Sequence, residues 1–178
     1  SSVYSGRNIM PNLRILWLGP NYRHRHNAGH EYFADAVGRL PGVEVVRYGQ
    51  GLGNSPACYL WGAGVDVPEL IERYGPFDLV VVQHIRHSVW EGMARVTIPK
   101  VGIVVDYFPR NEAQKNELFR AHGYDVLFFP EAWMIPRAMD SLNKPNVGMP
   151  FGFFWFPFSI DPAVFRPLPL PKLYDATI

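Results

Sequence analysis

A basic, histidine-rich stretch holds the densest group of side chains able to do chemistry in this sequence. Histidines and arginines alternate in it, and the candidate residues are Asn21, Arg23, His24, Arg25, His26, Gly29 and His30. An imidazole exchanges protons near pH 7, and arginines together with helix-start N–H groups neutralise a phosphate. We therefore predict that His24 and His26 act in catalysis and that the others bind substrate. The alternative is a solvated loop in which Asn27 caps the following helix.

The spacing of the histidines also permits a metal site. His24, His26 and His30 stand at distances typical of zinc ligands, and His84 and His87 offer further ligands. The first group contains no carboxylate, however, and the arginines between its histidines would repel a cation. We therefore predict no metal site.

Asp106 is the strongest single candidate for a catalytic residue. It follows the apolar run 100–105, and a carboxylate at the end of a strand can accept a proton or bind a sugar hydroxyl. The alternative is that Asp106 caps the turn that follows. The remaining candidates for substrate binding also stand at the ends of apolar runs: Gln83, His84, Tyr107 and Glu131. Glu131 equally suits the first turn of a helix, where the helix dipole favours an acidic side chain.

The elements that must position these residues alternate between strand and helix. Short apolar runs predict strands over residues 13–19, 43–48, 77–83, 100–105, 125–129 and 153–158. Helical spacing and start signals predict helices over residues 28–40, 67–74, 111–121 and 131–142. Nearly continuous apolar strands are typical of a parallel sheet covered on both faces. We therefore predict an α/β fold with a doubly wound, Rossmann-like parallel sheet in the strand order 3-2-1-4-5-6.

That strand order also predicts the location of the site. In a doubly wound sheet, ligands bind at the carboxyl ends of the strands, at the point where the winding reverses. The predicted order puts this point between the first and fourth strands, so the loops over 20–30 and 106–110 would border the same crevice. The loop over 83–87 would add further polar groups, and together the three loops hold five of the six histidines.

Composition excludes several other classes of protein. The 178 residues are 48% hydrophobic, enough for one sizeable core, and the net charge of +1 gives no footprint for nucleic acid. No apolar run reaches the roughly 20 residues of a membrane span. Cys58 is the single cysteine, so no disulfide can form within the chain. This favours a reducing compartment, and we expect a cytoplasmic protein.

The C-terminal part of the sequence carries a resemblance to a known family. The segment Pro157-Phe158-Ser159-Ile160-Asp161, followed by Phe165 and Pro167, resembles the crossover between the two halves of GT-B glycosyltransferases. The most similar group is the spore-coat maturation type, although Ser159 stands where glycine is usual. Tyr174-Asp175 then resembles the strand that opens the second Rossmann domain.

A second match lies in the middle of the chain. Ile98-Pro99-Lys100 resembles the start of a strand that, in this family, leads to a polar residue facing the cleft. The family histidine is replaced here by Val105, so the resemblance carries over to Asp106 alone.

The resemblance implies a domain plan and an activity. Residues 1–12 would form an N-terminal extension, 13–167 the acceptor-side Rossmann-like domain, and 168–178 the linker and the start of a C-terminal domain. The whole enzyme would move a sugar from a nucleotide-sugar donor to an unidentified acceptor, with the donor as co-substrate and no other cofactor. The C-terminal domain would hold most of the donor, so this chain alone would be nearly inactive. Two alternatives stay open: a non-catalytic Rossmann or flavodoxin-like binding module, and a subunit that needs a separate donor-binding partner.

Overall fold

The computed structural model describes residues 12–19, 32–49, 65–83, 85, 90–104, 107–142 and 152–155. The strands are β1 Leu13–Leu18, β2 Val43–Tyr48, β3 Val65–Asp66, β4 Leu79–Gln83, β5 Trp90–Glu91, β6 Lys100–Ile103, β7 Val126–Phe129 and β8 Gly152–Trp155. The helices are α1 Tyr32–Gly38, α2 Val67–Tyr74, α3 Glu112–His122 and α4 Met134–Leu142, with a short 3-10 helix over Met93–Arg95. Six strands form one sheet, and β3 and β5 form a separate two-residue ladder.

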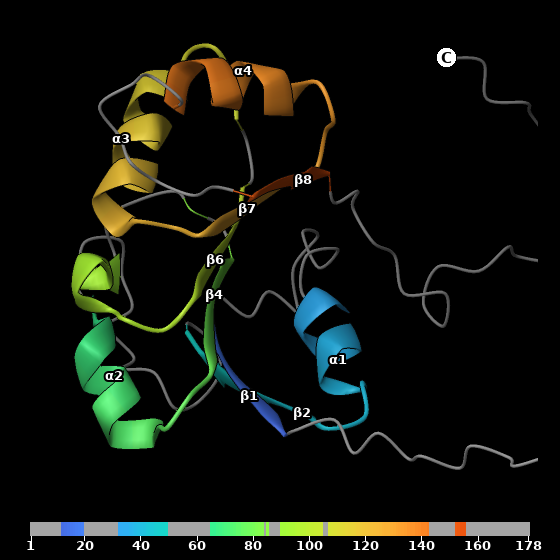
Figure 1. Ribbon diagram of the computed structural model, residues 1–178, viewed down its shortest axis with the longest axis vertical. Coiled ribbons are helices and arrows are strands. Elements are labelled where there is room, and N and C mark those ends of the chain that lie inside the picture. Colours follow the sequence, from blue (N-terminus) through green and yellow to red (C-terminus); the bar gives the residue numbers. More distant parts are fainter. Residues whose placement is uncertain are drawn as a thin grey trace, which may run out of the picture.

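The main sheet is parallel throughout, which confirms the predicted α/β fold class. Every pair of neighbouring strands runs in the same direction. Figure 1 shows α1 to the right of the sheet and α2 and α3 to its left. Helices on both faces are the mark of a doubly wound sheet. Each predicted strand and helix is present, with ends that shift by at most three residues where both ends are described, whereas β3, β5 and the 3-10 helix were not predicted.

The predicted strand order is wrong. The observed order is β2-β1-β4-β6-β7-β8, which is 2-1-3-4-5-6 when the six strands are counted along the chain. After β2 the chain forms α2, and the next strand of the sheet, β4, pairs with β1 on the side opposite β2. Val67 and Leu70 of α2 are buried in the core on the face opposite α1, and that burial decides which side of the sheet the crossover takes. Both orders obey the right-handed crossover rule, so handedness alone does not separate them.

Two apolar clusters hold the layers together, and they differ in size. The larger fills the face covered by α2, the 3-10 helix, α3 and α4. The smaller joins the other face to α1 through Phe33 and Ala34. Beside α1, that second face has an apolar groove of about 400 Å³, lined by Ile15, Trp17, Val37, Leu79, Val81, Val101, Ile103, Val126, Phe128 and Phe154. Among the described residues, α1 is the one helix on this face.

Local signals explain where α2 begins. Asp66 accepts a hydrogen bond from the N–H of Glu69 at 3.0 Å, and Pro68 occupies the first turn. A carboxylate cap satisfies an N–H that has no partner inside the helix, and proline suits the first turn. Asp66 also forms an ion pair with Arg95, which ties the start of α2 to the 3-10 helix.

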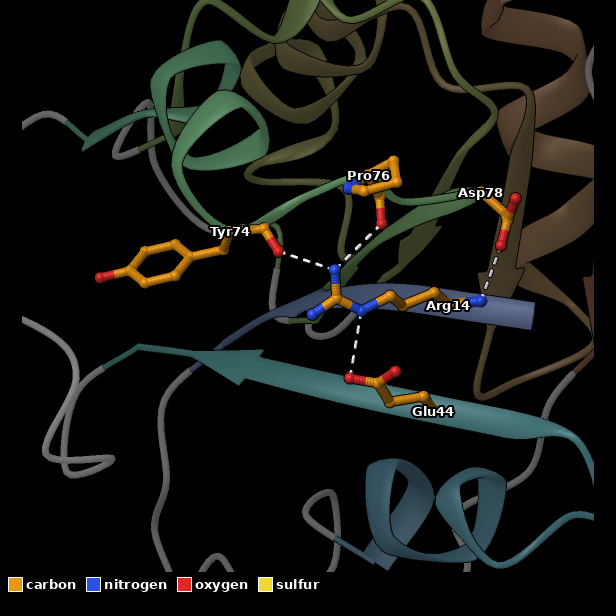
Figure 2. A network of polar contacts seen from close by, with 5 residues as sticks. All are labelled: Arg14, Glu44, Tyr74, Pro76 and Asp78. Carbon is orange, nitrogen blue, oxygen red and sulfur yellow. Dashed lines mark hydrogen bonds and ion pairs between the residues drawn. The ribbon is translucent and has the colours of Figure 1, made fainter. Parts of the chain in front are cut away.

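Arg14 joins three elements at the amino edge of the sheet (Figure 2). Its Nε pairs with Glu44 of β2 at 3.1 Å, and its Nη1 donates to the carbonyl oxygens of Tyr74 at 2.8 Å and Pro76 at 3.2 Å. The main-chain N–H of Arg14 also donates to Asp78 Oδ2 at 2.7 Å. One residue of β1 therefore bonds to β2, to the end of α2 and to the segment between α2 and β4, which helps to hold β1 between β2 and β4.

Candidate functional site

The observed strand order moves the crevice from its predicted position. The winding reverses at β1, which has β2 on one side and β4 on the other. Ligands of doubly wound sheets bind at such a reversal, at the carboxyl ends of the strands. The observed order therefore predicts a crevice between the carboxyl ends of β1 and β4, and β4 separates β1 from β6. The prediction that the winding reverses between β1 and β6 is wrong for this reason.

The main chains at this edge come close together because a glycine directly follows both β1 and β2. Gly19 donates its N–H to the carbonyl of Tyr48 at 3.1 Å. A Cβ added to Gly49 would lie 1.8 Å from the Gly19 carbonyl oxygen, and one added to Gly19 would lie 3.0 Å from Cβ of Gln83. No side chain fits at the end of β2, so the edge there is main chain alone. Gly19, Gly49 and Gln83 are all buried, so the three strand ends pack directly against one another.

Gln83 ends β4 and is fixed by a buried hydrogen bond. Its side chain is 1% exposed, and its Oε1 accepts from Nε1 of Trp17 at 2.7 Å. Indole nitrogen can only donate, so the amide oxygen must face Trp17 and the amide nitrogen must point away from it. The structure thus places Gln83, a predicted substrate-binding residue, at the carboxyl end of β4 in one defined orientation. Its role in binding stays a prediction.

Tyr107 and Glu131, the other described candidates, follow β6 and β7 and not β1 or β4. The Tyr107 side chain is fully buried, packs edge-on against Phe129, and its hydroxyl donates to Asn116 Oδ1 at 3.0 Å. The structure therefore gives Tyr107 a packing role in the core. Glu131 is exposed after β7 and accepts a hydrogen bond from the Trp133 indole. It leaves the same edge of the sheet, but β7 stands three strands from β1, roughly 14 Å away.

The remaining candidates lie outside the described residues. They are Asn21, Arg23, His24, Arg25, His26, Gly29, His30, His84 and Asp106. In the sequence they follow β1, β4 and β6, whose described carboxyl ends share one edge of the sheet. Their assigned roles stay predictions.

Sequence reasoning missed two buried polar residues on α3. Lys115 and Asn116 are each 4% exposed, and the Lys115 ammonium donates to the carbonyl oxygen of Ile85 at 2.9 Å. A buried lysine in this helix was hard to foresee, because polar residues occur all round it and no apolar stripe marks the inner face. The pairing of Tyr107 with Asn116 also gave no local signal.

His122 is the sole histidine among the described residues, and it lies at the opposite edge. Burial, followed by the nearby Lys100 charge, lowers the pKa of His122 from 6.5 to about 4. Its Nδ1 lies 3.0 Å from the hydroxyl of Tyr124, whose pKa burial raises well above its usual range. His122 is therefore neutral at pH 7 and belongs to the core. Within the described part of the chain, no group of three His, Cys, Asp or Glu residues is placed to hold a metal ion.

Comparisons with known proteins leave the site to be interpreted from its own geometry. No family model, no curated protein and no solved structure matches this chain. In the described ranges, no helix is long and apolar enough to cross a membrane. What the structure defines is a Rossmann-like α/β domain whose strand order reverses at β1, between β2 and β4.

Proposed function

We propose that this chain is the acceptor-side domain of a GT-B glycosyltransferase, which moves a sugar from a nucleotide-sugar donor to an acceptor hydroxyl. The observation that carries the proposal is the junction of Gly19, Gly49 and Gln83, where three strand ends meet at the reversal point of a parallel sheet. The resemblance of the sequence around Asp161 to the GT-B crossover supports the same conclusion.

The proposal assigns a role to each candidate residue. Asp106 accepts the proton of the acceptor hydroxyl or orients it, and His24 and His26 transfer protons near the donor diphosphate. Gln83 holds a polar group of the substrate at the crevice. The second domain holds most of the nucleotide. Catalysis then comes from orienting the two substrates across the cleft and from stabilising the departing diphosphate.

A second candidate function has one specific observation in its favour. The first five strands follow the order 2-1-3-4-5, which is that of flavodoxin-like domains. Such a domain binds its ligand alone at the same reversal point. The alternative is therefore a flavodoxin-like binding module with no transferase activity.

Calorimetry distinguishes the two functions. The chain is titrated with uridine, guanosine and thymidine diphosphate sugars, and we expect weak binding and no transfer, because the donor-binding half is a separate domain. The same assay on a chain extended through a second Rossmann domain should show tight binding and transfer. Micromolar binding by the present chain alone would place the donor site here and would reject the acceptor-side assignment. Absence of transfer by the extended chain would favour the binding module.

A further inference from the structure

Two lysines are buried in the described structure, and they lie at opposite edges of the sheet. Lys115 is 4% exposed and donates to the carbonyl oxygen of Ile85 at 2.9 Å. Lys100 is 8% exposed and donates to the carbonyl oxygen of Met93 at 3.2 Å. An ammonium group is costly to bury unless it is hydrogen-bonded, so each lysine restrains the main chain that it contacts. Lys100 begins β6 at the amino edge, whereas Lys115 acts at the carboxyl edge.

The segment that Lys115 holds is the continuation of β4. Ile85 stands two residues after Gln83 and is 1% exposed. It packs where Gly102 of β6 leaves room, since a Cβ added to Gly102 would lie 2.4 Å from Cδ1 of Ile85. The side chain of Ile85 is therefore held by packing and its carbonyl by Lys115. Together these contacts fix the position of Ile85.

The next residue of α3 holds the chain that follows β6. Asn116 accepts the hydrogen bond of Tyr107, whose ring stacks on Phe119 of the same helix. We call Lys115 and Asn116 the α3 clamp. Because its two members are consecutive on a helix, the clamp holds Ile85, which follows β4, and Tyr107, which follows β6, against the same part of α3. Both segments border the carboxyl edge where the proposed reaction takes place.

We propose that Lys115 is a positioning residue for this reaction. Its ammonium holds the main chain at Ile85 and so keeps Gln83 at the end of β4 in place, without contact to the substrate. The inference rests on the proposed function for its kinetic consequence. The structural part stands on the described contacts alone, so the two parts can fail separately.

The structural part is tested by NMR on the chain as it is. The reporters are the Cδ1 methyl of Ile85 and the indole N–H of Trp17, which donates to Gln83. Lys115→Met keeps the aliphatic stem and should shift both resonances, and Lys115→Arg, which keeps the charge and the donors, should shift them less. Lys100→Met is the matched control and should shift neither. Unchanged resonances in a folded Lys115→Met protein would overturn the inference.

The kinetic part uses the two-domain enzyme and the best nucleotide sugar from the calorimetric panel. Lys115→Met should lower kcat about tenfold with the donor KM unchanged, because the second domain binds the donor. Lys115→Arg should recover most of the rate, and Lys100→Met should leave kcat as it was. An unchanged kcat in Lys115→Met, or an equal loss in Lys100→Met, would overturn the positioning role. If the wild-type enzyme transfers no sugar, the proposed function fails. The NMR result alone then decides whether Lys115 holds the main chain at Ile85 and thereby Gln83.

A measurement on the unmodified chain covers the case in which Lys115→Met does not fold. A buried, hydrogen-bonded ammonium exchanges its protons slowly with water and gives a separate ¹⁵N resonance. Lys115 Nζ should give such a resonance, coupled to the carbonyl carbon of Ile85. A fast-exchanging Lys115 ammonium would show that the hydrogen bond does not hold the chain after β4, and would overturn the inference.

Discussion

At the scale of single residues, buried polar side chains in this protein connect segments that are distant in the sequence. Gln83 bonds to Trp17, which is 66 positions earlier, and Lys115 bonds to Ile85, which is 30 positions earlier. A buried polar group without a partner costs roughly 1–3 kcal/mol. Such a pair therefore specifies where two segments meet, and both of these pairs stand at the carboxyl edge.

Asp106→Asn tests the residue proposed to act on the acceptor. The change keeps the shape of the side chain and removes its charge, so turnover by the two-domain enzyme should fall by roughly 10²-fold if Asp106 is a general base. The melting temperature should stay the same. Asp140→Asn, at an exposed position on α4, is the control and should leave both quantities unaltered. Near-normal transfer with unchanged melting would reject the catalytic role, and a large fall in melting temperature would indicate a structural one.

At the scale of elements, contacts at the strand ends hold the three strands of the crevice in register. The amino edge has the Arg14 network, and the carboxyl edge has the close approach of Gly49 to Gly19. These contacts lie at opposite ends of the β2-β1-β4 unit. Loss of the Arg14 network should disturb this unit by removing polar contacts. Loss of the close approach at Gly49 should disturb it by steric overlap.

Arg14→Met tests the amino edge. The variant keeps the packing of the stem but loses the ion pair with Glu44 and the two hydrogen bonds to main-chain carbonyls. Because these groups are partly exposed to solvent, we expect the free energy of unfolding to fall by about 2 kcal/mol. Urea titration measures this change. Arg110→Met, at an exposed position, is the control and should cost less than about 0.5 kcal/mol. Equal effects of the two variants would contradict the importance of the network.

Gly49→Ala tests the carboxyl edge. The added methyl group would lie 1.8 Å from a main-chain oxygen, and main chain cannot move aside as a flexible side chain can. Overpacking of this kind costs about 3 kcal/mol, and the strand ends must separate to relieve it. Gly38→Ala is the control, since its Cβ would meet Val45 at an ordinary 3.6 Å. Thermal melting of both variants measures the difference, and a Gly49→Ala protein as stable as Gly38→Ala would refute the close approach.

At the scale of the whole molecule, the fold has unequal faces and a pH-sensitive core. Four elements cover one face of the sheet, and α1 alone covers part of the other in the described ranges. The better-covered face encloses His122 and Tyr124 beside Lys100. Protonation of His122 therefore affects the stability of the larger apolar cluster.

Stability should fall as the pH is lowered from about 6.5 towards 4. The pKa of His122 is 6.5 when unfolded and about 4 when folded, so between these values the unfolded chain binds a proton that the folded chain does not. The free energy of unfolding should fall by about 3 kcal/mol between pH 6.5 and pH 4, at up to about 1.4 kcal/mol per pH unit. Urea unfolding of the wild type and of His122→Asn at several pH values measures it. A difference between the two proteins that is independent of pH would contradict the prediction.

The sequence by itself determined the elements and the class of fold. Continuous apolar runs over β4 and β6 indicated strands buried on both faces, and Asp66 with Pro68 marked the start of α2. These signals are local, because periodicity and capping depend on residues a few positions apart. Gln83 was also identified as a site candidate from its place at the end of a strand.

The tertiary structure alone decided the strand order and the partners of the polar side chains. The residues of β4 do not indicate whether this strand pairs with β1 or with the outer side of β2. Burial of Val67 and Leu70 on the face opposite α1 goes with the pairing to β1. Tyr107 looked like a binding residue because it follows a strand, yet its hydroxyl bonds to Asn116 on a helix whose inner face has no sequence signature. Both results depend on contacts between distant segments, which no local pattern records.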